Sequence, residues 1–237
     1  MAMKAAPYIA PAPAFTWTGC CIGAHAGAGV LHDQGFQAGG LLLSTFDRHG
    51  IGGLAGGQIG CNYQTGMLVV GVEGEGFWSG MRINVDQFMG NTLVGSTTIR
   101  NKWDYDVAAR LGVAFGQALV YGKAGSVAGR FDWNQADINC GPSCSTTQGR
   151  STLDGLSIGL GLEYAFATNW TAKFEYDYLG FGAKNVAFAL TQTCGPLTAC
   201  PLLAATQIQS VSADKHIFKV GLNYLFNVGG PAVVARY

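Results

Sequence analysis

The sequence predicts an all-β protein, a closed eight-stranded antiparallel barrel that crosses a membrane. Three observations carry this prediction: little charge, much glycine, and apolar residues that recur at every second position. Of the 237 residues, 49% are apolar, 12% are charged and 36 are glycine. A soluble globular domain averages about 25% charged residues and about 7% glycine. The chain therefore has too little charge for an ordinary water-covered surface and too much glycine for a helical protein.

The charge balance and the length exclude further classes. The chain has 14 basic and 14 acidic residues, so its formal net charge is zero. A nucleic-acid-binding protein would carry a basic excess or a basic stripe. A disordered chain would combine low hydrophobicity with a high net charge. The sequence instead predicts one large folded domain that has no nucleic-acid partner.

Two uncharged stretches, Ala5–His32 and Gly50–Val72, make a helical membrane protein the first rival. Both are longer than the roughly 20 residues that a spanning helix needs. However, both contain many glycines, and the first also contains prolines. Glycine costs about 1 kcal/mol and proline about 3 kcal/mol at each helix-interior position. Neither stretch therefore predicts a stable helix.

Apolar residues occupy every second position in eight segments, which is the period of a β-strand. No Asp, Glu, Lys or Arg falls on any of these stripes. The stripes, counted at alternate residues, are Cys20–Val30, Ile51–Cys61, Leu68–Trp78, Trp103–Phe115, Ala118–Ala128, Leu156–Phe166, Trp170–Tyr178 and His216–Phe226.

The positions between the apolar ones hold glycines together with acidic and basic side chains, a mixture that suits the crowded interior of a narrow barrel. Because an unpaired buried charge is very costly, these side chains are expected to pair and to fill the lumen. Lys102 is also expected inside. The predicted lumen charge network is Glu73, Glu75, Asp104, Asp106, Arg110, Lys123, Glu163, Lys173, Glu175, Asp177 and Lys219.

The connections between the predicted strands alternate in length. They are short at Gln64–Met67, Gly116–Gln117 and Ala167–Asn169, and long at Leu31–Gly50, Ser79–Lys102, Gly129–Gly155 and Leu179–Lys215. Aromatic residues gather near the short turns: Trp17, Tyr63, Phe115, Tyr164, Phe166, Trp170, Tyr224 and Phe226. Short turns on one side, long loops on the other and an aromatic girdle are typical of an outer-membrane barrel rather than of a soluble two-sheet sandwich. In lipid an open sheet edge is prohibitive, so the eight strands must close.

This pattern divides the chain into three parts. Residues 1–15 are predicted as an extended periplasmic segment, 16–227 as the outer-membrane barrel and 228–237 as a C-terminal tail. The segment Met1–Phe15 has Pro, Tyr and Lys where a signal peptide needs an unbroken apolar run. We therefore interpret the numbering as that of a mature protein whose signal has been removed.

Several segments resemble the small outer-membrane immunogenic-protein family, which consists of eight-stranded barrels of the porin superfamily. The resemblance covers nearly the whole chain and implies a Gram-negative outer-membrane location and no known enzymatic activity. The family usually carries aromatic residues where this chain has Cys20, Cys21 and Cys61. The matching segments are Ala14–Gly19, Ile22–Gly23, Gly56–Gln64, Gly71–Glu75, Ala109–Gly112, Gly161–Phe166, Lys173–Tyr176, Val220–Phe226 and Gly229–Tyr237.

Six of the seven cysteines are expected to form disulfides in an oxidising compartment, which leaves one thiol over. Two close pairs lie in predicted long loops, Cys140 with Cys144 and Cys194 with Cys200. Of Cys20 and Cys21, one is expected to bridge to Cys61 on the adjacent strand. Cys20 falls on the lipid-facing stripe, so Cys21 and Cys61 are the candidate pair.

An eight-stranded barrel with a filled lumen predicts a structural or interaction role, without a cofactor or a resident metal. A narrow porin for small solutes and a lipid-modifying enzyme are the alternatives. His32 and His49 lie in the first predicted loop with Asp33, Ser44 and Asp47 nearby, which allows a triad or a metal site. No H-E-x-x-H, C-x-x-C or G-x-S-x-G pattern frames them.

The expected partners are outer-membrane lipid and another membrane protein or a second copy of the chain. Residues Asn185–Ala213 contain no charged residue although they belong to a predicted loop. Large exposed apolar patches usually mark contacts, but this loop can also fold over the barrel mouth against Leu41–Leu43. Small residues on the first two strands would let another protein approach closely. The candidate contact residues are Ala24, Ala26, Ala28, Gly53, Ala55, Gly57, Leu197, Leu202 and Leu203.

Overall fold

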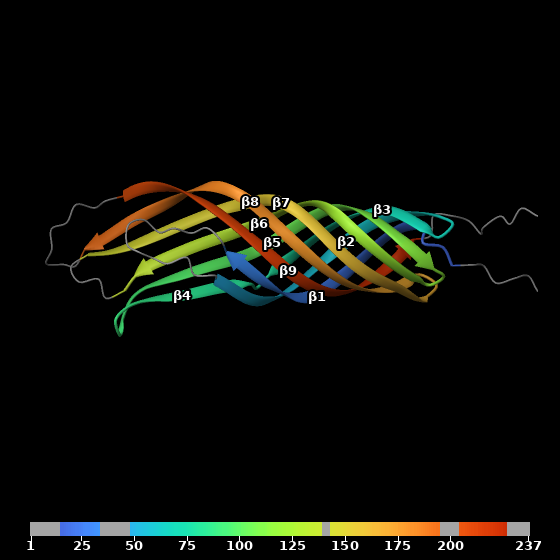
Figure 1. Cartoon of the computed structure of the whole chain (residues 1–237), viewed down its shortest axis with the longest axis horizontal. Helices are drawn as coiled ribbons and strands as arrows, with labels where there is room; N and C mark the ends of the chain where they lie inside the picture. Colours follow the sequence, from blue (N-terminus) through green and yellow to red (C-terminus); the bar gives the residue numbers. More distant parts are fainter. Residues whose placement is uncertain (1–14, 34–47, 139–142, 195–203, 227–237) are drawn as a thin grey trace, which may run out of the picture.

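The computed structural model describes residues 15–33, 48–138, 143–194 and 204–226, and most of this part of the chain forms antiparallel β-strands (Figure 1). The strands are β1 (Gly19–Asp33), β2 (Arg48–Thr65), β3 (Leu68–Ser79), β4 (Arg82–Met89), β5 (Thr92–Phe115), β6 (Ala118–Asp137), β7 (Ser143–Ala167), β8 (Trp170–Cys194) and β9 (Ala204–Phe226). Among the described residues no helix is long and apolar enough to cross a membrane.

Eight of these strands form the closed ring that the sequence predicts. The order around the ring is β3-β2-β1-β9-β8-β7-β6-β5, and pairing of β3 with β5 closes it. Strand β4 is additional: it follows β3 after a break at Gly80 and Met81 and pairs with the first half of β5. The prediction of an eight-stranded antiparallel barrel is therefore confirmed, with one extra strand on its rim.

The short connections fall where the sequence predicts them. Gly66 and Gly116 each open a tight turn with a positive φ, of 60° and 64°. Glycine adopts this backbone conformation without steric cost, which favours it in two-residue hairpins. Gly90 does the same, with a φ of 61°, in the β4–β5 hairpin, which the sequence did not predict because it lies inside the expected long loop Ser79–Lys102. These turns fix the register of the strands they join.

Three of the four long connections differ from the prediction, because much of each one is strand. Strands β5 to β9 contain 24, 20, 25, 25 and 23 residues. A tilted strand crosses a bilayer with about 9–11 residues. The wall therefore continues well past the membrane at the end opposite the short turns, on the left in Figure 1. The expected loops Ser79–Lys102, Gly129–Gly155 and Leu179–Lys215 are in large part this extended wall.

The two faces of the strands follow the predicted alternation at membrane level. On β7, for example, Leu156, Ile158 and Leu160 are exposed on the outside, whereas Ser157 and Glu163 are buried inside. One stripe is shorter than predicted. Ala128 is buried together with its neighbours Val127 and Gly129, so the outward stripe of β6 ends at Ser126.

Trp17 also departs from the prediction. It was expected in the lipid-facing girdle, but it is fully buried, with 0% of its surface exposed. Its indole Nε1 donates a hydrogen bond to the carbonyl of Gly116, and its backbone N–H donates one to the side chain of Gln64. Because these bonds draw it across the short-turn end of the barrel, Trp17 lies under the lumen rather than in lipid.

The interior of the barrel has three layers. At the short-turn end an apolar cluster contains Trp17, Val69, Ala114, Leu119, Tyr121 and Ala165, with Phe15 packed against it. Charged and polar side chains fill the middle. A larger cluster, the upper apolar cluster, fills the extended end and contains Leu31, Leu54, Phe77, Met81, Ile83, Ile99, Val127, Phe131, Trp133, Leu153, Leu179, Phe181, Val186, Phe188, Val211, Ala213 and Ile217.

Candidate functional site

The middle layer of the lumen is the largest concentration of ionisable groups among the described residues. All eleven charged residues of the predicted lumen network are buried there. They come from strands β3, β5, β6, β7, β8 and β9, so the network ties most of the wall together. Its function depends on whether these groups are paired.

Arg110 lies at the centre of the group nearest the short-turn end. Its guanidinium contacts Glu73 at 3.2 Å and Glu163 at 2.8 Å, and it lies 3.8 Å from the centre of the Tyr121 ring. Lys173 reaches Glu73 from the opposite wall at 3.2 Å. Two cations therefore share Glu73 across the lumen, and Arg110 also holds Glu163. An Arg fork that contacts two carboxylates fixes geometry as well as charge.

The next group is built around Lys123 and Lys219. The Lys123 ammonium lies 2.7 Å from Glu75 and 2.9 Å from Glu175, and the Lys219 ammonium lies 2.5 Å and 2.9 Å from the same two carboxylates. Lys219 also reaches Asp177 at 2.5 Å. Each carboxylate is thus held by cations from two strands. Such multiple pairing is what makes buried charge tolerable.

Three carboxylates of this layer, Glu73, Glu75 and Glu175, offer oxygens within 4.8 Å of one another, as in a metal site. However, Lys123 lies within 4.0 Å of all three carboxylates. Lys173 contacts Glu73 and Glu175, and Lys219 contacts Glu75 and Glu175. The ammonium groups provide the positive charge that a metal ion would bring. The arrangement therefore neutralises itself and needs no added cation.

One lysine of the lumen was not predicted, and one predicted lysine lies elsewhere. Lys215 is fully buried and contacts Asp104 at 2.5 Å, beneath the rings of Phe131 and Phe181. Lys102 sits at a bulge in β5, turns outward and pairs with Asp132 at 2.7 Å. The bulge inserts one residue and so reverses the side to which Lys102 points.

Neutral polar side chains, also missed from the sequence, complete the layer. His25 Nδ1 and the Gln58 side-chain oxygen lie 2.5 Å apart, and Gln58 donates to Asn223 at 2.7 Å. Asn223 then donates to Glu163 at 2.8 Å. Ser157 donates to Asp106 at 2.6 Å. These residues share the inward parity of the charged ones, but they carry no charge that distinguishes them in the sequence.

The disulfide differs from the predicted pair. Cys20, not Cys21, is bonded to Cys61, whereas Cys21 is a buried free thiol. In the β1–β2 register Cys20 lies directly opposite Cys61, whereas Cys21 lies opposite Gly60. Directly opposed residues point to the same face of a sheet, so only Cys20 can reach Cys61. Cys144 is also disulfide-bonded, but Cys140 and Cys200, and the side chain of Cys194, lie outside the described part.

The predicted contact residues are described on the wall but not in the fourth loop. Ala24, Ala26 and Ala28 on β1 and Gly53, Ala55 and Gly57 on β2 are exposed on the outer face. Leu197, Leu202 and Leu203 lie outside the described residues, as do Leu41–Leu43. Several apolar residues expected in an exposed loop are instead inside: Val186, Phe188 and Val211 belong to the upper apolar cluster.

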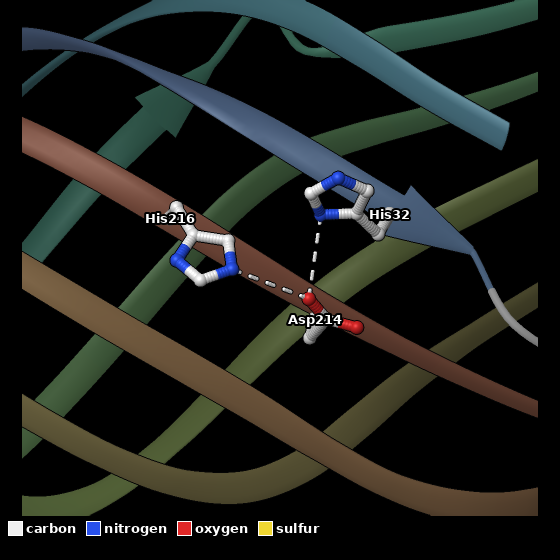
Figure 2. A group of neighbouring side chains, drawn as sticks. All are labelled: His32, Asp214 and His216. Carbon is white, nitrogen blue, oxygen red and sulfur yellow. Dashed lines mark ion pairs between the residues drawn. The ribbon is translucent and has the colours of Figure 1, made fainter. Parts of the chain in front are cut away.

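The histidines predicted in the first loop lie on strands. His32 is opposite His49 in the β1–β2 register, while Ser44 and Asp47 are outside the described residues. Closure of the ring brings His32 to two residues that the sequence did not associate with it, Asp214 and His216 of β9 (Figure 2). This cluster lies on the outer face, apart from the lumen network.

Comparison with known proteins supports the location that this architecture implies. The model of the outer membrane protein beta-barrel domain family matches residues 14–226. The chain is 30% identical to the 31 kDa outer-membrane immunogenic protein of Brucella melitensis, over 93% of this chain and 88% of that protein. It is also 30% identical to a 22 kDa outer membrane protein of Rhizobium leguminosarum, over 73% and 68% of the two chains.

A solved structure shares the fold at low sequence identity. The crystal structure of the outer membrane protein OprG of Pseudomonas aeruginosa aligns with a TM-score of 0.53 and 13% identity, over 90% of this chain and 99% of that one. The family match, the two relatives and the closed ring agree on a Gram-negative outer-membrane location. The chain belongs to the family of outer membrane protein beta-barrel domains.

Proposed function

We propose that this barrel is sealed, and that it acts as a structural and partner-contacting protein of the outer membrane rather than as a porin or an enzyme. The observation that carries the proposal is the layered interior: a paired charge network lies between two apolar clusters. An eight-stranded ring has room only for its own side chains. A solute would have to displace both clusters and break several ion pairs at once.

Conductance measurements test the seal. The full chain, reconstituted in planar lipid bilayers beside a sixteen-stranded porin as positive control, is expected to show no steady openings above those of a protein-free bilayer. A Trp17→Ala variant is expected to stay closed as well, because the charge network and the upper apolar cluster remain. Steady openings of the wild type would overturn the proposal and favour the narrow-porin alternative.

The same contacts argue against catalysis in the lumen. Glu75 and Glu175 are a carboxylate pair of the kind that acid–base enzymes use, but Lys123 and Lys219 bind both. Catalytic carboxylates need access to a substrate and contrasting environments. Incubation of the reconstituted protein with lipid A and phospholipids should leave the lipid masses unchanged. A new lipid species, absent with heat-unfolded protein, would contradict a non-enzymatic role.

Partner contact is proposed to use the smooth outer wall of β1 and β2. Ala26 and Ala55 are directly opposed there and exposed. Small residues let backbones approach closely in lipid, where van der Waals packing drives association. Replacing both by Trp should abolish the cross-linked species that the wild type gives in native membranes. The control is Trp at Ala109 and Ala124, an equally exposed and directly opposed pair on β5 and β6. A wild type that is strictly monomeric would refute the contact.

A further inference from the structure

The cluster of His32, Asp214 and His216 lies where the first and last strands of the barrel meet. Asp214 is directly opposite His32 in the β1–β9 register, and His216 follows Asp214 by two residues on the same face. All three side chains are partly exposed on the outer surface. Below them on β9 the outward residues are Phe218 and Val220, both exposed and apolar. The cluster therefore sits just above the lipid-facing band, toward the extended end of the barrel.

The ligand atoms of this cluster converge on one carboxylate oxygen, as Figure 2 shows. Asp214 Oδ2 lies 3.4 Å from His32 Nδ1 and 3.7 Å from His216 Nε2, and all three atoms lie within 4.8 Å of one another. Ligands that bind Zn²⁺ tetrahedrally at about 2.0–2.2 Å are roughly 3.3–3.6 Å apart. Two of the three separations are thus already close to those of a bound site.

A hydrogen bond orients one of the two imidazoles. Tyr176 Oη lies 2.7 Å from His216 Nδ1. A neutral histidine that coordinates through Nε2 carries its proton on Nδ1, where it can donate to this oxygen. Metal-binding histidines commonly have such a partner, which fixes both the tautomer and the direction of the ring. Tyr178 also packs against the His216 ring, with 5.2 Å between ring centres.

The other imidazole presents a nitrogen that has an ion-pair contact with Asp214 but no hydrogen bond among the described residues. His32 Nδ1 is shielded from solvent and makes no hydrogen bond among the described residues. It faces Asp214 Oδ2, and the His32 ring lies edge-on to that of His216 at 5.6 Å. Buried polar atoms without a partner are costly and call for a specific explanation. A cation held between the three side chains would satisfy this nitrogen.

We propose that His32, Asp214 and His216 form a binding site for a first-row divalent transition metal, of which Zn²⁺ is the representative. Two imidazoles and one carboxylate match the ligand preference of these ions, whereas Ca²⁺ and Mg²⁺ prefer oxygen ligands. Three protein ligands leave a coordination position open to water or to a further ligand. Because the ligands come from β1 and β9, a bound ion would also link the first and last strands of the barrel.

Titration of the full-length, detergent-solubilised protein with Zn²⁺, followed by calorimetry, tests the site. One ion per chain is expected to bind. His32→Ala, Asp214→Asn and His216→Ala should each weaken binding at least tenfold. Tyr176→Phe should weaken it by about tenfold, because it removes only the orienting partner. The control Asp154→Asn, which removes an exposed carboxylate on β7, should leave binding unchanged.

Two further measurements distinguish a specific metal site from nonspecific cation binding. Far-ultraviolet circular dichroism of each variant should match the wild type, because the side chains lie on the outer surface. A hundredfold excess of Ca²⁺ should not displace Zn²⁺. Absence of Zn²⁺ binding, binding that survives all three ligand substitutions, or full displacement by Ca²⁺ would each overturn the proposal.

Discussion

The membrane-level section of the barrel and the section above it are built from the same strands with opposite chemistry. On β9, the lower section turns Phe218 and Val220 outward and Lys219 inward. The upper section turns Asp214 outward and buries Ala213 and Val211. Strand β6 repeats the change: Lys123 is inside below, whereas Phe131 and Trp133 are inside above, with Asp132 outward.

This inversion follows from the solvent around each section. In lipid the outer face must be apolar, so polar side chains are confined to the lumen, where they must pair. In water the outer face can be polar, and an apolar interior gains the usual hydrophobic stabilisation. The register irregularities of β5 and β8, at Asn101/Trp103 and Phe181/Lys184, fall at this transition. The interior of the upper section is therefore packed in the manner of a soluble core.

The largest expected effect comes from unpairing the lower section. Lys219→Met leaves Glu75, Glu175 and Asp177 without one of their cations in a buried site. Removing one partner of a buried ion pair costs about 3–5 kcal/mol, because the remaining charge is uncompensated. Urea unfolding in lipid vesicles, followed by tryptophan fluorescence, measures the change in the free energy of unfolding.

The matched control for this experiment is Lys184→Met. Lys184 also pairs with a carboxylate, Asp154 at 3.1 Å, but this pair is exposed. Exposed pairs contribute about 0–1 kcal/mol. If both variants lose the same free energy of unfolding, burial does not make the ion pairs of the lumen network more important for stability than an exposed pair.

Phe131→Ala is the corresponding change in the upper section. Phe131 is fully buried, packs edge-on against Phe181 at 5.2 Å, and lies 5.0 Å from the Lys215 ammonium. Truncation of a buried phenylalanine costs about 3–5 kcal/mol through lost burial and the cavity left behind. Because the loss is confined to the section above the membrane, amide exchange should increase in β6 near residue 131 and not near Lys123. Uniform exchange along β6 would show that the two sections do not behave independently.

The inversion also explains which parts of the fold could be predicted from the sequence. The predicted stripes consist of apolar residues at outward positions. They end at His216 on β9 and at Tyr178 on β8, because the outward positions beyond these residues are no longer apolar. Alternation continues beyond these points with the faces exchanged, which is why extended strands were interpreted as loops. Lys215 was missed for the same reason, although it lies four residues before Lys219 and therefore on the same face.

Other features depend on long-range geometry that one sequence does not contain. Trp17 precedes the first strand, so no alternation indicates its side, and its burial depends on Gly116 and Gln64. The outer cluster requires the register of β1 with β9, which only closure of the ring determines. His32 was therefore considered with its sequence neighbours instead of with Asp214 and His216.

Cys20 and Cys21 give the third test, because neighbouring residues of one strand face opposite sides of the wall. Cys20→Ala removes the bond to Cys61 and should lower the free energy of unfolding by about 2–4 kcal/mol, since the unfolded chain loses a cross-link. Cys21→Ala should cost less, because it removes only a small buried thiol. Maleimide labelling of the folded wild type should leave Cys21 unmodified. A larger loss in the free energy of unfolding for Cys21→Ala than for Cys20→Ala would contradict the assigned bond.

The smallest expected effect compares two glycines on adjacent strands, one on each face. A methyl group added at Gly27, on the inner face of β1, would meet the carbonyl oxygen of Phe218 at 2.1 Å. Added at Gly53, on the outer face of β2, it would meet only the carbonyl oxygen of Gly27 at 3.7 Å, an ordinary contact. Gly27→Ala should therefore cost about 1–3 kcal/mol through overpacking, whereas Gly53→Ala should change stability by less than about 0.5 kcal/mol. The same urea titration measures both. If the two substitutions cost the same, the close approach of the β9 backbone to Gly27 would be refuted at this level of the wall.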